Sequence, residues 1–336
     1  MLVTLTGAYR NAGDHLIGAR ARALLSEFVE ADIVNVDRRS IGDAEYELFN
    51  NARAVILCGG PAYQKEMFPK VYNLDLSRIS TRVIPLGLGW KGSLNDTPET
   101  FKFAPAALEF IGEVHSRIQL SSVRDVVTEQ VVRNTGASNV SMTGCPAWYD
   151  LAHLNSEYIH KASPSLIVFS MPAKPQPNVL ETLALITKKY PRAQKVLALH
   201  HGWKPAQTKH GERMLRWHAQ VAALAGLRGW KTMSIADGLT KFEELYSAAD
   251  LHIGYRVHAH LYSLSQQSAS ILVNEDSRGV GQVSTLGGPM LMATSSPDQI
   301  LAAIEEHYAS GGAAVANSAA VIKQTFPKMR EFLATI

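Results

Sequence analysis

Short apolar runs alternate with longer amphipathic stretches along most of the chain. In the first half, the runs that we expect to form strands are residues 2–6, 32–36, 54–58, 83–88, 118–122 and 139–142. Between the first two, apolar residues recur at helical spacing over 14–29, and Asp14 is placed to cap that helix. Residues 104–114 and 126–134 are further expected helices. Runs that are apolar throughout are typical of parallel strands covered on both faces, so the pattern predicts an α/β fold.

The alternation breaks at residues 147–164 and then starts again. The second half predicts strands at 166–170, 195–200, 232–235, 251–254, 270–273 and near 290–293. Its expected helices are 179–189, 211–225, 241–248, one that begins near Val257, 297–310 and 315–333. Two such sets in tandem indicate two Rossmann-like domains that face a cleft, over 1–155 and 164–312, followed by a C-terminal helix over 313–336 that could pack back on the first domain.

The composition narrows the class of protein. Hydrophobic residues make up 46% of the 336 residues and charged residues 19%, which excludes a disordered chain. With 33 Lys and Arg against 30 Asp and Glu, the net charge of +3 does not argue for a nucleic-acid partner. Cys58 and Cys145 are too few for a disulfide framework. Because the N-terminus lacks the basic and apolar regions of a signal peptide, we expect a cytoplasmic enzyme with a small-molecule substrate.

Two turns of the first half follow predicted strands and carry glycine. Asn11, Gly13 and Asp14 lie where the first strand gives way to a helix, whose free N–H groups favour an anion or an oxygen-rich group. Gly59 and Gly60 follow a very apolar strand and form a tight bend. Each turn could border a ligand, or could be a plain helix cap or a structural bend.

Two other motifs of the first half are more equivocal. Residues 87–92 match the dinucleotide string G-x-G-x-x-G, but no helix is expected to follow, so we reject a nicotinamide site there. Arg124 and Asp125 follow a predicted strand end. Arg124 could bind a carboxylate or phosphate through two parallel hydrogen bonds, or could form a surface salt bridge with its neighbours.

The segment 249–260 holds the most polar chemistry at one turn. Arg256 and His258 are expected where a short buried strand enters an apolar helix, and the free N–H groups of that helix add positive potential. Together they predict a pocket for a small dianion. A zinc site made from His258 and His260, with His252, is the weaker alternative because no carboxylate or cysteine completes the ligand set.

Two further turns are expected at the same sheet edge. Glu275 and Arg278 lie in a predicted polar loop over 274–281. His200 or His201 could face the cleft after another strand, and His200 is our choice. Trp203 could stack on a sugar ring or cover the core.

The order of these motifs resembles the polysaccharide pyruvyl transferase family. The resemblance rests on motifs that run from residue 10 to about 285, namely Asn11-x-Gly13-Asp14, Gly59-Gly60, Ser122-x-Arg124-Asp125, Gly144-Cys-Pro-Ala147 and Arg256-x-His258-Ala259. It implies a GT-B-like fold with the acceptor on the first domain and the donor, phosphoenolpyruvate, on the second. It also implies that Arg256 and His258 match the donor-site Arg and His of the family.

The chain departs from the family pattern at two positions. Pro61 replaces a third glycine that often follows the pair, which affects the acceptor side. Arg278 lies where the family often has lysine, which changes a point-charge contact into a fork that could still bind phosphate or carboxylate.

The resemblance implies transfer of a pyruvyl group to sugar hydroxyls, with release of phosphate. Arg256 and Arg278 would neutralise the donor, and His258 would protonate its methylene carbon. Asp14 is our first choice of base for the attacking hydroxyl and Glu275 the second, while Asn11, Gly13, Gly59, Gly60, Arg124, His200 and Trp203 would help to bind substrate. No metal or cofactor is expected.

Two other functions fit the same cleft. A GT-B-like glycosyltransferase would bind a nucleotide sugar there, and a non-catalytic member of the fold would bind a sugar or anion without releasing phosphate. The expected partners are the small donor and a sugar or lipid-linked saccharide. The sequence leaves open a peripheral contact with the inner membrane surface and a homo-oligomer.

Overall fold

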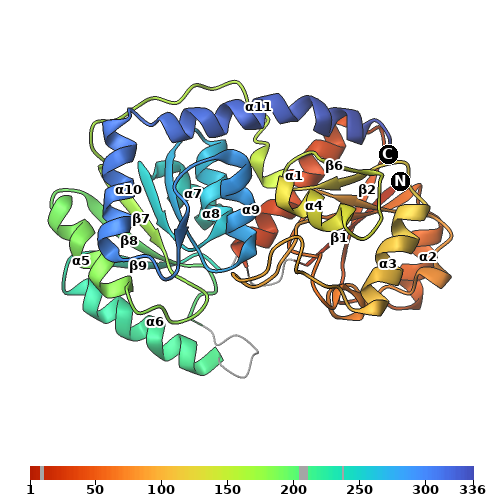
Figure 1. Ribbon diagram of the computed structural model, residues 1–336, viewed down its shortest axis with the longest axis horizontal. Helices are drawn as coiled ribbons and strands as arrows, with labels where there is room; N and C mark the ends of the chain where they lie inside the picture. Colours follow the sequence, from red (N-terminus) through yellow and green to blue (C-terminus); the bar gives the residue numbers. More distant parts are fainter. Residues whose placement is uncertain (8–10, 204–210, 237) are drawn as a thin grey trace.

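The computed structural model describes residues 1–7, 11–203, 211–236 and 238–336, and Figure 1 shows two α/β halves side by side. The sheet of the first half has the strand order β2-β1-β3-β4. These strands are β1 (Leu2–Thr6), β2 (Ile33–Asp37), β3 (Ala54–Cys58) and β4 (Arg82–Leu86). A short parallel pair, β5 (Ser121–Val123) and β6 (Val140–Met142), lies beside β4 where Leu88 bridges to Val123.

The sheet of the second half has the order β12-β11-β10-β7-β8-β9, and its strand pairs are parallel. The strands are β7 (Leu166–Ser170), β8 (Gln194–Leu199), β9 (Trp230–Ser234), β10 (Leu251–Gly254), β11 (Ala269–Asn274) and β12 (Leu291–Met292). β7, β10 and β11 lie at its centre and are buried almost throughout. This burial agrees with their mostly apolar sequences, and the parallel pairing places the carboxyl ends of these strands side by side.

Helices cover both sheets (Figure 1). The first half contains α1 (Ala12–Phe28), α2 (Asp43–Asn50), α3 (Pro105–Ser116) and α4 (Val126–Arg133). The later helices are α5 (Val179–Lys189), α6 (Gly211–Gly226), α7 (Thr240–Ala248), α8 (Val257–Ser265), α9 (Ser277–Leu286), α10 (Pro297–Ala309) and α11 (Ala313–Leu333). The sequence pattern did not predict α2 or α9.

The prediction of a polar loop over 274–281 is correct only for Glu275 and Asp276, because Asn274 ends β11 and α9 begins at Ser277. Asp276 caps α9, and its carboxylate accepts the backbone N–H of Arg278 at 3.0 Å. The helix then continues through Gly279 and Gly281. Both glycines are buried, and a Cβ added to Gly281 would meet the carboxylate of Asp125 in the first half. Close packing between the halves therefore accounts for Gly281, whereas a Cβ added to Gly279 would collide with Asn274 of β11.

The cap of α1 also differs from the prediction. Asn11, not Asp14, is the N-cap residue, and its side-chain oxygen accepts the N–H of Gly13 at 3.2 Å. Both residue types are good caps, so the sequence alone did not decide between them. Asp14 lies in the first turn instead, where its side chain is available to a cavity.

The helix α11 starts in the second half and ends beside the N-terminus in the first (Figure 1). Phe326 makes an edge contact with Phe28 of α1, with ring centroids 5.8 Å apart. The carbonyl of Ile336 accepts hydrogen bonds from Arg53 at 3.1 Å and from Arg82 at 2.7 Å. The C-terminal helix thus packs on the first half.

Candidate active site

A cavity of about 230 Å³ lies where strand ends of the two halves meet. Most of its lining follows β1, β2 and β3, and Arg278 comes from the second half. The lining residues are Thr6, Gly7, Asn11, Asp14, Ile17, Arg38, Cys58, Gly59, Gly60, Pro61, Gln64, Lys91 and Arg278. We name it the interdomain cavity. Its position matches the general rule that open α/β sheets bind ligands at the carboxyl ends of their strands.

The turn between β1 and α1 brings the two halves into contact. A Cβ added to Gly13 would collide with the imidazole ring of His258 at the start of α8. Only glycine allows the backbone to approach this ring so closely. The turn therefore places Asp14 and His258 on adjoining parts of the structure, although they are more than 240 positions apart in sequence.

Asp14 carries the carboxylate of the interdomain cavity. Burial raises the pKa of Asp14 above its ordinary value, against the opposing effects of Arg38, Asn11 and Arg278. A carboxylate with a raised pKa is a better proton acceptor than one that is freely hydrated. The arrangement gives this cavity a group that can take a proton.

Gly59 and Gly60 form the bend after β3, with φ of +54° and +78°. A side chain is strained in this region of backbone conformation. A Cβ on Gly59 would also collide with Ile17 of α1, whereas space beside Gly60 is open. The pair therefore forms part of the cavity wall from backbone atoms.

Arg256 is the N-cap residue of α8, and its guanidinium is held from one side. Its Nε donates to the carbonyl of Met171 at 2.8 Å, and its backbone N–H donates to the hydroxyl of Ser170 at 3.1 Å. One terminal nitrogen is buried and has no hydrogen-bond partner among the residues that the structure describes. A buried donor without a partner is costly unless a ligand accepts from it, so Arg256 is placed to bind an anion.

His258 lies in the first turn of α8 and is buried. Burial and the charges of Arg124, Arg278 and Arg256 lower the pKa of His258 to about 3. The ring is therefore neutral near pH 7 when no anion is bound. An anion that neutralises these arginines would raise its pKa.

Arg278 joins the two parts of the site. Its guanidinium pairs with Asp276 at 2.8 Å, it lines the interdomain cavity, and its charge affects the pKa of Asp14, His258 and Arg256. The hydroxyl of Ser277, next to it, accepts the N–H of Gly92 at 2.6 Å. This contact between the halves fixes the start of α9 beside the segment that carries Lys91.

The sequence profile of one family, described as polysaccharide pyruvyl transferase, matches residues 11–277. The chain belongs to the polysaccharide pyruvyl transferase family. The match includes Asn11, Asp14, Arg256 and His258, and it ends one residue before Arg278. Membership of this family identifies the chain as a transferase. A comparison with curated proteins finds no significant match.

Solved structures with a similar fold include several UDP-GlcNAc 2-epimerases. S. aureus MnaA, solved with UDP, matches with a TM-score of 0.63 and 10% identity, over 100% of this chain and 97% of that one. The UDP-GlcNAc 2-epimerase of Neisseria meningitidis, bound to UDP-GlcNAc, has a TM-score of 0.57 and 11% identity, over 98% and 100%. The Methanocaldococcus jannaschii enzyme has a TM-score of 0.56 and 10% identity, over 91% and 92%. These similarities show that this pyruvyl transferase family member has a GT-B-like fold.

Two residues of the predicted binding set, His200 and Trp203, do not line the interdomain cavity. His200 is buried in the core, where its ring bonds to the hydroxyl of Tyr246 at 2.8 Å and packs on Phe242. The charge of Arg256, together with burial, lowers the pKa of His201, the neighbour of His200, to about 3. Trp203 lies in the turn after β8, where it is 44% exposed. It is not among the residues that line the interdomain cavity.

Arg124 is not on the surface, contrary to the salt-bridge interpretation. It is 1% exposed, and its guanidinium donates to Asp125 at 2.9 Å and to the carbonyl of Trp90 at 2.9 Å. Asp125 caps α4 through the N–H of Thr128 at 2.7 Å. The pair is therefore a buried structural element, and the charge of Arg124 affects the site through the pKa of His258.

Glu275 is engaged by backbone rather than open to substrate. Both carboxylate oxygens accept the N–H of Ala173 at 3.0 Å, and one also accepts that of Lys174 at 3.3 Å. These bonds hold the turn after β7, whose Met171 carbonyl binds Arg256. The position favours Asp14 over Glu275 as the proton acceptor.

The zinc alternative finds no support in the arrangement of its histidines. His252 bonds to the hydroxyls of Ser170 and Ser270, at 2.8 and 2.7 Å, and His260 bonds to Ser270 at 2.7 Å. Among the described residues, no group of three or more His, Cys, Asp and Glu could hold a metal ion. Over the same described ranges, no helix is long and apolar enough to cross a membrane.

Sequence reasoning missed three polar residues of the cavity. Arg38 directly follows β2, so the rule on strand ends that identified Asn11 could have found it. Gln64 and Lys91 also line the cavity. Lys91 falls within the G-x-G-x-x-G string at 87–92, which we rejected as a nicotinamide site, so this lysine was not predicted to bind substrate.

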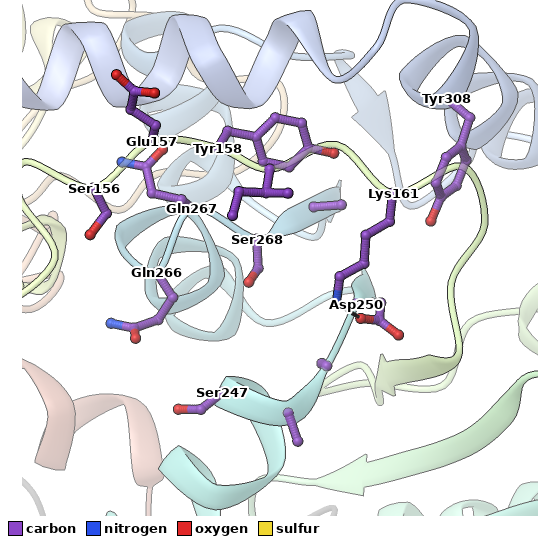
Figure 2. Close-up of a pocket in the computed structure, with 14 residues that line it drawn as sticks. Ser156, Glu157, Tyr158, Lys161, Ser247, Asp250, Gln266, Gln267, Ser268 and Tyr308 are labelled. Carbon is purple, nitrogen blue, oxygen red and sulfur yellow. Dashed lines mark hydrogen bonds and ion pairs between the residues drawn. The ribbon is translucent and has the colours of Figure 1, made fainter.

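A second cavity, of about 200 Å³, lies at the opposite edge of the second sheet (Figure 2). It forms where the linker 156–161 passes the segments that precede β10 and β11. Figure 2 shows Lys161 and Asp250 paired with one another, with hydroxyl and amide groups around them. We name it the linker cavity. None of the predicted site residues lines it.

Proposed function

We propose that the protein transfers the pyruvyl group of phosphoenolpyruvate to hydroxyls of a sugar in a polysaccharide or its precursor, forming a pyruvyl ketal and releasing phosphate. The observation that carries the proposal is the convergence of Arg256, Arg278, His258 and Asp14 from two halves of a pyruvyl transferase family member. Family membership supports the reaction class, and the charges of the site support the donor.

The two arginines would bind the donor. Phosphoenolpyruvate carries a carboxylate and a phosphate, and guanidinium groups bind both through paired hydrogen bonds. Arg256 offers a buried nitrogen without a described partner, and Arg278 reaches the interdomain cavity from α9. The N-terminus of α8 adds positive potential at the same place.

His258 would deliver the proton that starts the reaction. The methylene carbon of the donor gains this proton and becomes the methyl group of the product, while C2 becomes electrophilic. Two sugar hydroxyl oxygens then bond to C2, and the bond from C2 to the phosphate oxygen breaks. Of the two hydroxyl protons, one restores the protonated histidine. The other is accepted by Asp14 and passes to the leaving phosphate, so atoms and charges balance. Binding of the anionic donor would raise the low pKa of His258 and supply the protonated ring.

Asp14 would accept the proton of the attacking hydroxyl. It lines the cavity from the first half, and burial raises its pKa. It lies beside Gly13, which contacts the ring of His258. Acid and base thus come from opposite halves, with the donor between them.

The test measures phosphate release from phosphoenolpyruvate with galactose-, mannose- and glucose-containing acceptors. We expect release that depends on the acceptor and falls by about 10²- to 10³-fold in Arg256→Ala, since a preorganised charge contact is lost. Lys323→Ala on the exposed side of α11 is the matched control. No release with any acceptor, together with a thermal shift caused by a nucleotide sugar, would contradict the proposal and favour a glycosyltransferase.

A further inference from the structure

The interdomain cavity continues into a larger surface groove of about 600 Å³. Gln64 and Lys91 line both, so the two spaces adjoin. We call this the lysine groove and define it by the residues that matter here, Gln64, Lys65, Lys70, Lys91, Phe101 and Lys102.

Three chain segments hold the groove together. The N–H of Lys91 donates to the carbonyl of Tyr63 at 2.9 Å, and the N–H of Ala104 donates to the carbonyl of Lys65 at 2.8 Å. These bonds place the segments around residues 64, 91 and 102 side by side. The lysines therefore gather because of the backbone path, and they come from three different parts of the sequence.

The charges of the groove are not balanced within the protein. Four lysines line it, against the two carboxylates of Glu66 and Asp96. Glu66 pairs with Lys70 at 3.1 Å, and Asp96 accepts the N–H of Ser93 at 2.6 Å. In the part of the chain that the structure describes, the other three lysines make no ion pair. Burial lowers the pKa of Lys91, and the charge of Arg278 adds to this effect.

An aromatic ring lies among these ammonium groups. Phe101 is half-buried and packs edge-on against Trp90 at 5.3 Å and Phe103 at 5.0 Å, which holds the ring in place. A fixed apolar ring suits the apolar face of a sugar, and lysines are strong point-charge partners for phosphate and carboxylate oxygens.

We infer that the lysine groove binds an anionic part of the acceptor saccharide, next to the sugar that would react at Asp14. This inference rests on the proposed function for what happens in the interdomain cavity. The shared chemistry is a saccharide with anionic oxygens close to the reacting ring. Those oxygens belong either to a uronate carboxylate or to a diphosphate that links the sugar to a carrier.

Calorimetric binding without phosphoenolpyruvate tests the inference separately from transfer. The probes are trigalacturonate, a short-prenyl diphosphate N-acetylglucosamine and neutral galactotriose, each with the full chain. We expect at least one charged probe to bind about tenfold more tightly than the neutral one, with a preference that weakens as salt rises. The charged probe that binds identifies the source of the anion.

The variant Lys65→Gln/Lys102→Gln should remove that preference, whereas Lys323→Gln on α11 should keep it. Lys65 and Lys102 are both exposed, so the fold should persist in the double variant, and thermal melting checks this. Equal binding of charged and neutral probes, absence of binding by all three, or an unchanged preference in the double variant would overturn the inference. If a charged probe binds but no acceptor gives phosphate release, the inference about the lysine groove is supported and the proposed function is contradicted.

Discussion

The interdomain cavity and the linker cavity are similar in size, about 230 and 200 Å³, but they differ in charge and position. The first lies at the carboxyl ends of strands and sets Arg38, Lys91 and Arg278 around Asp14. The second lies at the amino ends of β10 and β11, where Lys161 pairs with Asp250. A surplus of cations, with a helix N-terminus nearby, makes the first cavity the candidate anion site. Volume alone would not separate them.

The largest effect should come from the acid. We expect His258→Gln to lower kcat by about 10³-fold, because a positioned proton donor is lost while the arginines remain. Donor affinity should change little. Phosphate release at saturating phosphoenolpyruvate measures the first quantity and calorimetry the second. A variant with undiminished kcat would remove His258 from the mechanism.

The carboxylate across the cavity should matter next. Asp14→Asn keeps the size of the side chain but cannot accept the proton, so we expect kcat to fall by about 10²-fold. Because the pKa of Asp14 is raised, the wild-type rate should fall as pH drops toward that pKa. The pH–rate profile of Asp14→Asn should lack this acid limb. If the limb persists unchanged in the variant, another group titrates.

As the pH falls, the stabilisation that comes from the buried histidines of α8 should be lost before that from Asp250 in the linker cavity. Burial holds the pKa of His258 and His260 at about 3, whereas unfolded histidine has a pKa of about 6.5. The unfolded chain therefore takes up protons between these values, and the free energy of unfolding falls as pH drops from 6.5 toward 3. The pKa of Asp250 is lowered from 3.8, so its contribution is lost only below that value.

We expect the Tm to fall by about 5 °C or more between pH 7 and pH 5. Calorimetric melting at several pH values measures it. The fall should be smaller in His258→Gln, which lacks one of these groups. A constant Tm over this range would show that the buried rings do not govern acid stability.

The smallest effect should follow from breaking the ion pair of the linker cavity. The side chain of Lys161 is 63% exposed, so Lys161→Ala should lower the free energy of unfolding by less than about 1 kcal/mol. Asp250 keeps its bonds from the N–H groups of Ser165 and Leu166. Urea unfolding and phosphate release are the measurements, and the rate should equal that of wild type. A large loss of rate would mean that the two cavities are coupled.

The sequence predicted the elements whose pattern is local. β3 is an unbroken apolar run and β7 another, and α5 has apolar residues at helical spacing, so their bounds were predicted correctly. α9 was missed because its two glycines lower helix propensity. The packing of Gly281 against Asp125 of the first half, and of Gly279 against Asn274 of β11, overrides that low propensity. Local pattern carries no record of such contacts.

Within the candidate site, too, the sequence predicted what depends on local pattern and missed what depends on tertiary contacts. The strand-end rule found Asn11, Asp14, Arg256 and Arg278 because it depends only on where strands stop. It could not choose between His200 and His201, since one residue of register decides which side chain enters the core. The packing of His200 against Phe242 and Tyr246 is a tertiary property.

The crossing of α11 limits how the molecule can move. The linker between the halves and α11 both run along the same side of the molecule in Figure 1, and the last residue is held by Arg53 and Arg82. Because both connections lie along one edge, we expect the two halves to move mainly by rotation about that edge. The distance between acid and base in the proposed reaction would then depend on a single angle.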